Sequence, residues 1–576
     1  MSSRQAASGP STGPGRMEQW AGYAFWLAVV LLFVKAIAAR LALPHTPFSD
    51  PDVWGYLFPG LSKLMGDDFV HTNGRSFPYP LFVYGILKTT GSFTPIALIQ
   101  HAFGLAGGAA LIWIWHRLAL FFPLTRVTRV VYWLTGLSIL ASYLLSKGTL
   151  LMEHSIRPEA IFPFFTILCP LLAVEYVIAF YRKKNLRLAF FLGAALVFDA
   201  LLVYFLKPAW GLAAGTAVLP LLHSFLHLKG RWLWKSAVLV LPVAVVAVTL
   251  WYPEKQLAAK HDPRAERFLS QLLFSFNAHI IYPLLEADVA SPNPPFDRAL
   301  IARVAELVKI ELDRDTKAYT SLGFDADNLM YRRRNPDGTI RDSVVSVLAD
   351  HYKRDNAGFK GFCQHYYFQA WRARPGQMLG KIVTQYLQYI RLRDDPFDRG
   401  KAKIEMGFQA ERSLKSLDPL KKPLPVYETY LADIRAQLGS DDLWRQSGSV
   451  GRINRFLRPV NIIGLFFTVG LGGYLLFEAR KRAGREGCFS DLVIPTALTA
   501  YFYSISFGKC VTVAIVHTME VSRYVKNQLI YIVLAEGAAV VLFAIVVERL
   551  VRHYRNRRRP ASPADTPRES QPARPA

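Results

Sequence analysis

Residues 187–227 read RLAFFLGAALVFDALLVYFLKPAWGLAAGTAVLPLLHSFLH. A bilayer core is about 30 Å thick, and about 20 apolar residues in an α-helix cross it. The stretch therefore predicts two membrane-spanning helices, 187–206 and 209–227, joined by a tight turn at Lys207-Pro208. A lysine in the middle of about 40 apolar residues needs an anionic partner or a water-filled cavity.

The same pattern recurs along the chain, which has 576 residues, 52% of them hydrophobic and 13% aromatic. This composition is too apolar for a soluble protein of this size. The sequence therefore predicts an all-α polytopic membrane protein with about ten transmembrane helices. The expected spans are 20–43, 95–116, 130–147, 159–181, 187–206, 209–227, 236–252, 457–477, 489–507 and 528–549.

Lysine and arginine follow every second expected span, as in the runs 182–184 and 480–482. Basic loops stay in the cytoplasm, so this pattern predicts that both termini are cytoplasmic. The net charge of +25 is largely a consequence of this topology, and no nucleic-acid partner is implied. The parts expected on the opposite, extracytoplasmic side are the loops 44–94, 147–158 and 508–527 and the segment 253–456.

The spans divide the chain into five regions. A cytoplasmic tail (1–19) precedes a transmembrane core (20–252), whose first outer loop is 44–94. An extracytoplasmic region (253–456) precedes the C-terminal spans (457–550) and a basic tail (551–576), which is expected to be disordered and cytoplasmic.

Helical spacing of apolar residues predicts that the region 253–456 is mainly helical. Within it, the stretch 371–382 mixes aromatic, basic and apolar residues. This stretch is either an interfacial helix lying on the membrane or a surface helix of the outer region.

The first outer loop carries two acids at the mouth of the expected bundle. It contains FSDPDVWGY at 48–56, and GRSFPYP follows at 74–80. Asp50 and Asp52 are costly at the bilayer edge unless a reaction or an ion uses them, so this loop is the first candidate for an active site. Asp52 is alternatively the N-cap of a helix that begins after Pro51. A divalent cation, Mg²⁺ or Mn²⁺, is a candidate ligand of the two acids, although no spacing in the chain matches a metal motif.

Three further outer positions carry charges: EHSIRPE at 153–159, Lys207, and HTMEVSRY at 517–524. Together they bring acids and fixed cations to one leaflet. Each has a structural alternative, because Arg157 and Lys207 are also candidates for snorkelling at span ends. Glu520 and Arg523, three residues apart, are alternatively an ion pair within one helix.

In combination these strings resemble the GT-C superfamily of polytopic glycosyltransferases. The nearest families are the aminoarabinose transferase of lipid A and the protein O-mannosyltransferases. The likeness covers roughly 20–250 and 457–550, and more faintly 376–390. The strings that carry it are Asp52 four residues before Tyr56, Arg-x-x-x-Tyr-Pro at Arg75 to Pro80, Arg157-Pro158-Glu159, Lys207-Pro208, and Glu-x-x-Arg-Tyr at Glu520 to Tyr524.

The resemblance implies a GT-C-like bundle that takes a sugar from a polyprenyl phosphate and passes it, with inversion, to an extracytoplasmic acceptor. That acceptor is a lipid, a glycan or a protein, and membrane lipids surround the site. One carboxylate would deprotonate the attacking hydroxyl. Relatives often carry Asp-Glu in the first-loop motif, whereas here Val53 follows Asp52 and Asp50 precedes it, so the identity of the base stays open.

The leaving phosphate would be held by basic side chains, because guanidinium and ammonium groups stabilise developing phosphate charge. The candidates are Arg75, Arg157, Lys207 and Arg523. Supporting residues implied by the same strings are Tyr56, Tyr79, Glu159, His517, Glu520 and Tyr524.

Two other classes of function stay open. A secondary transporter would also carry intramembrane charges, but it should show internal repeats and broken spans in matched halves, which this sequence lacks. A non-catalytic subunit of cell-envelope polysaccharide export would tolerate replacement of Asp50 and Asp52, whereas a transferase would not. The Ala- and Arg-rich composition favours a bacterial inner membrane as the location.

Overall fold

The computed structural model describes residues 16–48, 53–71, 75–314, 327–334, 340–390, 424–438, 448–481, 489–517 and 528–558. The secondary-structure elements of this part of the chain are all helices apart from a two-stranded antiparallel sheet of β1 (Arg333–Arg334) and β2 (Ile340–Arg341). It contains ten helices long and apolar enough to cross a membrane, or up to 11 if a pair bent by 87° at 275–278 counts as one span. The predicted all-α polytopic architecture is confirmed.

The candidate spans overlap the ten stretches expected from the sequence. They are formed by α1 (Arg16–Leu41), α4 (Thr94–Leu118), α5 (Arg126–Leu144), α7 (Phe162–Val177) with η2 (Ile178–Arg182), α8 (Leu186–Leu206), η3 (Pro208–Trp210) with α9 (Gly211–Ala217) and α10 (Leu219–His227), α11 (Trp232–Val246) with η4 (Ala247–Trp251) and α12 (Tyr252–His261), α23 (Gly448–Lys481), η6 (Ser490–Leu492) with α24 (Val493–Val516), and α26 (Leu529–Arg558).

Shorter helices lie between the spans. Those before the fourth span are α2 (Trp54–Leu64), α3 (Pro78–Thr90), α6 (Lys147–Glu153) and η1 (Pro158–Ala160). Those between the seventh and eighth spans are η5 (Ala265–Arg267), α13 (Phe268–Ser275), α14 (Ala278–Ala290), α15 (Arg298–Arg314), α17 (Asp327–Met330), α18 (Val344–Tyr352), α19 (Asn356–Ala373), α20 (Pro375–Ile390) and α22 (Pro425–Leu438).

Local sequence explains several helix ends near the outer loops. Pro158 and Pro208 each occupy the first position of a short 3-10 helix, where proline's missing N–H leaves no hydrogen bond unmade. The residues before them, Arg157 and Lys207, are extended, as proline requires of its predecessor. Both cations therefore lie at the points between spans where one helix ends and the next begins.

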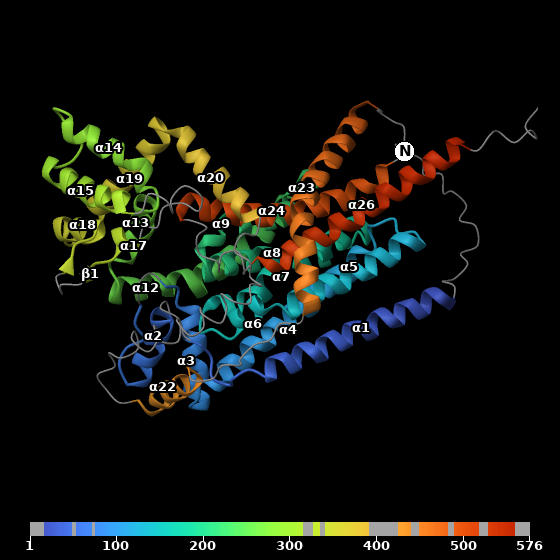
Figure 1. Ribbon diagram of the computed structural model, residues 1–576, viewed down its shortest axis with the longest axis horizontal. Coiled ribbons are helices and arrows are strands. Elements are labelled where there is room, and N and C mark those ends of the chain that lie inside the picture. Colours follow the sequence, from blue (N-terminus) through green and yellow to red (C-terminus); the bar gives the residue numbers. More distant parts are fainter. Residues whose placement is uncertain are drawn as a thin grey trace, which may run out of the picture.

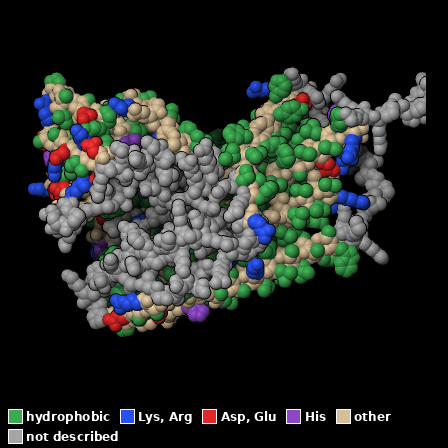
Figure 2. All heavy atoms as spheres, viewed as in Figure 1, with side chains coloured by type: hydrophobic (Ala, Val, Ile, Leu, Met, Phe, Trp, Pro, Cys, Tyr) green, Lys and Arg blue, Asp and Glu red, His purple; other side chains and the backbone are tan. Residues whose placement is uncertain are grey.

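The helix α26 forms the centre of the bundle. Its most apolar window is 72% buried, against 17% for the span that contains α11 and α12. Trp115, Trp210 and Tyr531 are among the fully buried side chains of the core around it. Peripheral spans expose their apolar side chains, as expected of helices that face lipid, and Figure 2 shows this apolar surface beside the more charged outer helices.

The two ends of the bundle differ in what they carry. Figure 1 places the start of α1 and the end of α26 at one end, and α2, α3, α22 and the helices α13 to α19 at the other. Both described chain ends thus lie together, in agreement with an even number of spans. Which end is cytoplasmic stays a prediction.

The helix α20 lies against the bundle. Tyr386 packs edge-on against Phe507 of α24, with ring centroids 5.1 Å apart. One face buries Met378, Lys381 and Gln385, whereas Leu379, Val383 and Leu387 on another face are exposed. An apolar face turned outward from a helix packed on a membrane span favours the interfacial interpretation for the part of the predicted stretch that lies in α20, whereas residues 371–373 belong to α19.

Candidate active site

Five of the residues predicted for the site lie outside the described residues. They are Asp50, Asp52, Glu520, Arg523 and Tyr524. The described residues that flank the two acids are Phe48 and Val53, and those that flank the last string are His517 and Gln528. The roles of the five residues stay predictions.

The structure brings two of the predicted motifs, Arg157-Pro158-Glu159 and Lys207-Pro208, into contact. Lys207 Nζ pairs with Glu159 Oε1, so the end of α8 contacts the short helix η1 that precedes α7. The side chain of Glu159 is 3% exposed and that of Lys207 is 14% exposed. The anionic partner that a lysine at this position needs is therefore Glu159.

A second lysine lies beside this pair. Lys509 of α24 is fully buried, and its Nζ is 4.5 Å from the centre of the Trp210 ring, a cation–π distance. It is close enough to Lys207 and Glu159 to interact with both electrostatically. Sequence reasoning missed Lys509 because it placed the end of the ninth span at 507. That boundary is wrong, since α24 continues to Val516.

A glycine explains how α24 approaches this part of the bundle. A Cβ atom at Gly508 would meet backbone atoms of Leu212 and Ala213 at 2.9 Å. The absence of a side chain thus lets α24 pack against the backbone of α9, and Thr512 Oγ1 accepts a hydrogen bond of 3.1 Å from Leu212 N. This close approach brings Lys509 next to Trp210 at the start of the same span.

The outer loop contributes an arginine and two tyrosines. Arg75 Nη1 donates to Tyr56 Oη at 3.3 Å, and the guanidinium lies 5.1 Å from the centre of the Tyr56 ring. Tyr56 in turn packs edge-on against Tyr79, with ring centroids 5.6 Å apart. A Cβ atom at Gly55 would lie 3.0 Å from Arg75 Cγ, so the glycine leaves room for this arginine.

Tyr79 connects the loop to the span ends. Its side chain is buried, and it donates a hydrogen bond of 2.6 Å to Gln100 Oε1. Burial raises the pKa of Tyr79 well above its ordinary value, so its hydroxyl stays protonated. The hydroxyl also lies beside the backbone of Arg157 and within electrostatic range of Glu159.

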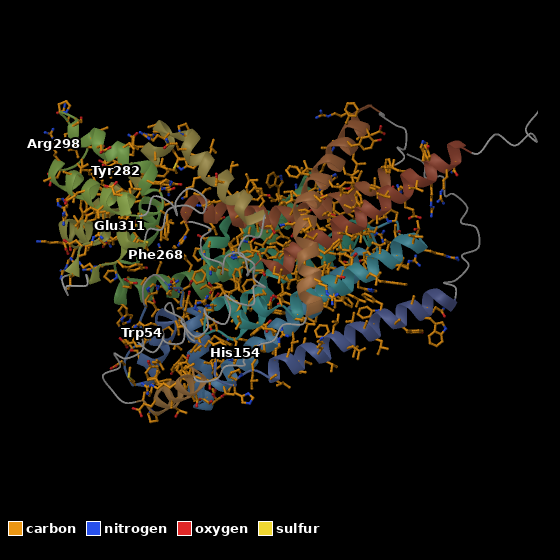
Figure 3. The ribbon with its side chains drawn as sticks, in the orientation of Figure 1. Trp54, His154, Phe268, Tyr282, Arg298 and Glu311 are labelled. Carbon is orange, nitrogen blue, oxygen red and sulfur yellow. The ribbon has the colours of Figure 1, made fainter. Side chains whose placement is uncertain are left out.

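The structure therefore brings Lys207 and Lys509 to Glu159, two residues after Arg157, and it places Arg75 on Tyr56, which packs against Tyr79. Arg157 is 7% exposed. These cations come from the outer loop, from the segment before α7, from the end of α8 and from α24. Figure 3 shows Trp54 and His154 of this neighbourhood toward the end of the bundle that carries α2 and α3. Such an arrangement is suited to holding an anion at the membrane edge.

His517 is placed differently from the other predicted residues. Its ring stacks on Phe276, with centroids 3.7 Å apart, so it contacts the end of α13. It lies about two turns beyond Lys509 along the chain, at the end of α24. His517 therefore lies where α13 meets α24.

No group of three or more His, Cys, Asp or Glu side chains that could hold a metal occurs among the residues that the structure describes. The cation predicted for Asp50 and Asp52 falls on residues outside that part. It stays a prediction.

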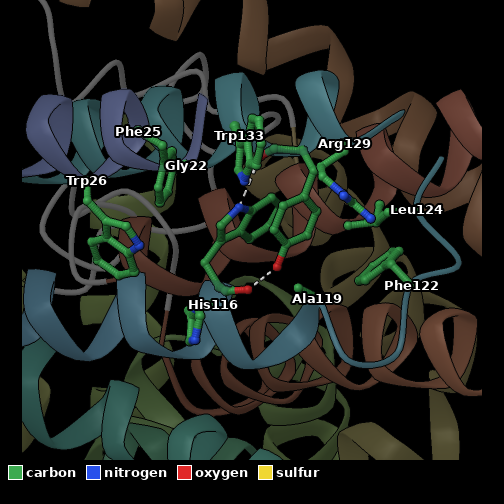
Figure 4. A pocket seen from close by; sticks show the side chains of 11 residues that line it. Gly22, Phe25, Trp26, His116, Ala119, Phe122, Leu124, Arg129 and Trp133 are labelled. Atoms are coloured by element: carbon green, nitrogen blue, oxygen red, sulfur yellow. Dashed lines mark hydrogen bonds between the residues drawn. The ribbon is translucent and has the colours of Figure 1, made fainter. Parts of the chain in front are cut away.

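A pocket of about 420 Å³ lies at the other end of the bundle, between the first turns of α1, the end of α4 and the start of α5. Trp26, Trp133, His116 and Arg129 are among its lining residues (Figure 4). Two other lining residues are hydrogen-bonded, since Trp115 Nε1 donates to the Tyr132 carbonyl oxygen at 3.1 Å. None of the predicted site residues lines this pocket, so the candidate site and the pocket are separate features.

No protein-family model matches the chain, and no curated protein matches its sequence. The structure is similar to the crystal structure of ArnT from Cupriavidus metallidurans bound to undecaprenyl phosphate. The likeness covers 89% of this chain and 77% of that chain, with 11% sequence identity and a TM-score of 0.29. An overlap at this level says nothing of the activity of this chain, and the functional proposal therefore rests on its own side chains.

Proposed function

We propose that this chain is a membrane glycosyltransferase that moves a sugar from a polyprenyl-phosphate donor to an extracytoplasmic lipid, glycan or protein acceptor, with inversion. The observation that carries the proposal is that Lys207 and Lys509 both lie at Glu159, in the segment that also contains Arg157. A lipid phosphate entering from the bilayer would meet these cations between the span ends. The motif order that resembles polytopic glycosyltransferases supports the same function.

The basic residues would hold the leaving phosphate. When the bond between the anomeric carbon and the phosphate oxygen breaks, its electron pair stays on that oxygen, and the charge must be stabilised where water is scarce. Arg157 offers a planar fork suited to two phosphate oxygens, whereas Lys207 and Lys509 act as point charges. Arg75, held against Tyr56, would approach from the outer loop.

One of the two loop acids would act as the base. The acceptor oxygen loses its proton to a carboxylate and attacks the anomeric carbon from the face opposite the phosphate, so the configuration inverts. The flanking residues support this place for the acids. Phe48 forms a parallel bridge with Ser155, two residues before Arg157, and Val53 is buried at the start of α2, the helix that carries Tyr56.

Purified protein in lipid nanodiscs, given radiolabelled polyprenyl-phosphate sugars with membrane lipids and glycans as acceptors, tests the proposal. The expected result is transfer of label by the wild type and weakened transfer by Lys207→Gln. Lys309→Gln, on the exposed face of α15, is the matched control. Binding of the lipid-linked sugar without transfer would favour a transporter or an export subunit instead.

A further inference from the structure

Five buried polar residues beside the candidate site form one hydrogen-bonded chain of side chains and backbone groups. They come from α1, from α4 and from the end of α6. Arg40, Gln100, His101, Glu153 and His154 are each no more than 5% exposed. Ionisable groups buried inside a membrane bundle are costly, and those that persist are usually tied to function.

Glu153 is the centre of this chain. Arg40 Nε and Nη2 each donate to one of its carboxylate oxygens at 2.8 Å, in the bidentate geometry that makes strong ion pairs. Arg40 Nη1 also donates to the carbonyl oxygens of Ala36 and Leu144 at 3.1 Å. The pair thereby joins the last turn of α1 to the end of α5.

Two histidines extend the chain from Glu153 to the backbone before the loop acids. His101 Nδ1 lies 3.0 Å from Glu153 Oε2, and His101 Nε2 lies 3.2 Å from His154 Nδ1. His154 Nε2 lies 2.9 Å from the carbonyl oxygen of Thr46.

The acceptors at the two ends determine where the protons are. A carbonyl oxygen only accepts, so His154 carries its proton on Nε2 and accepts at Nδ1. His101 then donates from Nε2 to His154, and its Nδ1 faces the Glu153 carboxylate at 3.0 Å. Burial and the neighbouring His101 lower the pKa of His154 to about 3, in agreement with a neutral ring.

The backbone of His154 holds the same segment. Phe48 N donates to the His154 carbonyl oxygen at 2.8 Å, and Ile156 N donates to the Phe48 carbonyl oxygen at 2.8 Å. The segment 46–48 ends two residues before Asp50, the first loop acid, and the segment 154–156 directly precedes Arg157. The ring and the backbone of His154 thus hold the segments 46–48 and 154–156 side by side.

A branch of the chain reaches Tyr79. Gln100 Nε2 donates to the carbonyl oxygens of Glu153 and Ser155 at 2.8 and 3.1 Å, while its Oε1 accepts from Tyr79. One turn further along α4, Gly104 leaves the space that the Glu153 carboxylate fills, because a Cβ atom there would overlap that carboxylate. Any side chain larger than that of glycine at position 104 would therefore clash with the Glu153 carboxylate.

We propose that Arg40, His101, Glu153 and His154 are positioning residues, which form a buried clamp that sets the spacing between the segment 46–48, before the loop acids, and the segment 154–156, before Arg157. The effect of the clamp on transfer rests on the proposed function, whereas the clamp itself does not. Its loss would displace the base from the donor without removing a group that touches either. A misplacement of about 1 Å can slow such a reaction by about 10²-fold.

Cysteines at Phe48 and Ser155 test the clamp directly, because neighbouring residues on paired backbones lie within disulfide distance. We expect the double variant to cross-link quickly, and to cross-link more slowly once His154→Phe or Gly104→Ala is added. Gly104→Ala removes no polar group, so it separates crowding of Glu153 from loss of a hydrogen bond. The controls are His223→Phe, an exposed histidine, and Gly470→Ala, where a Cβ atom meets nothing within 4 Å.

Amide hydrogen exchange and transfer kinetics provide two further tests of the clamp. In the wild type, the Phe48 and Ile156 amides should exchange with deuterium slowly, which requires no variant. In transfer assays, the clamp variants should lower kcat by about 10²-fold and leave the KM for the lipid-linked sugar nearly unchanged. Fast exchange at both amides, or cross-linking unaffected in folded clamp variants, would overturn the clamp. Absence of transfer by the wild type with slow exchange intact would instead overturn the proposed function.

Discussion

Lys207 and Glu159 form an ion pair between residues 48 positions apart, across the ends of two neighbouring spans. Glu159 is nearly inaccessible and has Lys509 nearby as well. The pair therefore holds a charged centre at the edge of the bundle, and a phosphate arriving there would compete with Glu159 for the same ammonium groups.

Replacing Lys207 or Arg157 by glutamine should weaken binding of a polyprenyl-phosphate sugar by about 1.5–3 kcal/mol each, because each would remove a charged hydrogen bond to the phosphate. Affinity for the acceptor should change much less. Native mass spectrometry with titrated lipid measures both. Donor binding that survives both substitutions unchanged would make these cations structural.

The variant Lys509→Met should distinguish a role of Lys509 in donor binding from a role in the stability of the protein. The buried lysine is held by an aromatic face, and an apolar side chain of similar length should leave the thermal midpoint unchanged or raise it. Donor affinity should nevertheless fall. A lower midpoint with unchanged donor affinity would show that Lys509 serves only to pack against Trp210.

Glu159→Gln should destabilise the protein by about 3 kcal/mol, since it leaves Lys207 without its carboxylate in a site that is largely buried. The double variant Glu159→Gln with Lys207→Met should recover much of that loss, because both charges are gone. Thermal unfolding in one detergent compares the two. If the double variant is as unstable as Glu159→Gln, the ion pair is not the cause.

A histidine between the outer loop and the end of α12 should make stability depend on pH. His71 Nε2 lies 2.9 Å from Glu254 Oε1, and His71 Nδ1 lies 3.4 Å from Asp262 Oδ2. Burial opposes protonation, but hydrogen bonds to Asp262 and Glu254 outweigh it and raise the pKa of His71 from 6.5 to about 9. A raised pKa means that the folded state binds the proton more tightly.

The stabilisation from His71 is therefore full below about pH 6.5 and is lost as the pH rises toward 9. The midpoint difference between the wild type and His71→Gln should shrink over that interval, by an amount equivalent to roughly 2 kcal/mol. A difference that stays constant from pH 6 to about pH 9.5 would contradict this assignment.

Much of the fold could be predicted because each span is a local property of the chain: an apolar run long enough to cross a bilayer. The end of α24 was misplaced because Ser504, Ser506, Lys509 and Thr512 lower its hydropathy. Ser506 and Lys509 face the bundle interior, where polar groups contact protein and not lipid.

The pairing of charged groups could not be predicted in the same way. Arg40 and Glu153 are 113 positions apart, and nothing local in either segment indicates the other. The Lys207 and Glu159 strings were each recognised, but their contact depends on how α7 and α8 pack. Long-range packing of this kind is a property of the folded bundle.

Sugar transfer from a radiolabelled polyprenyl phosphate by the purified chain, compared between the wild type and Asp52→Asn, is the most direct measurement. We expect the wild type to transfer the label and Asp52→Asn to be slower by about 10²-fold or more, as for loss of a general base, with unchanged folding. Asp67→Asn, an exposed acid in the same loop, should behave as the wild type. If Asp50→Asn is the damaging change, the two acids exchange roles. Near-normal transfer by both Asp50→Asn and Asp52→Asn, or no transfer by the wild type with any lipid-linked sugar, would contradict a transferase site at this loop.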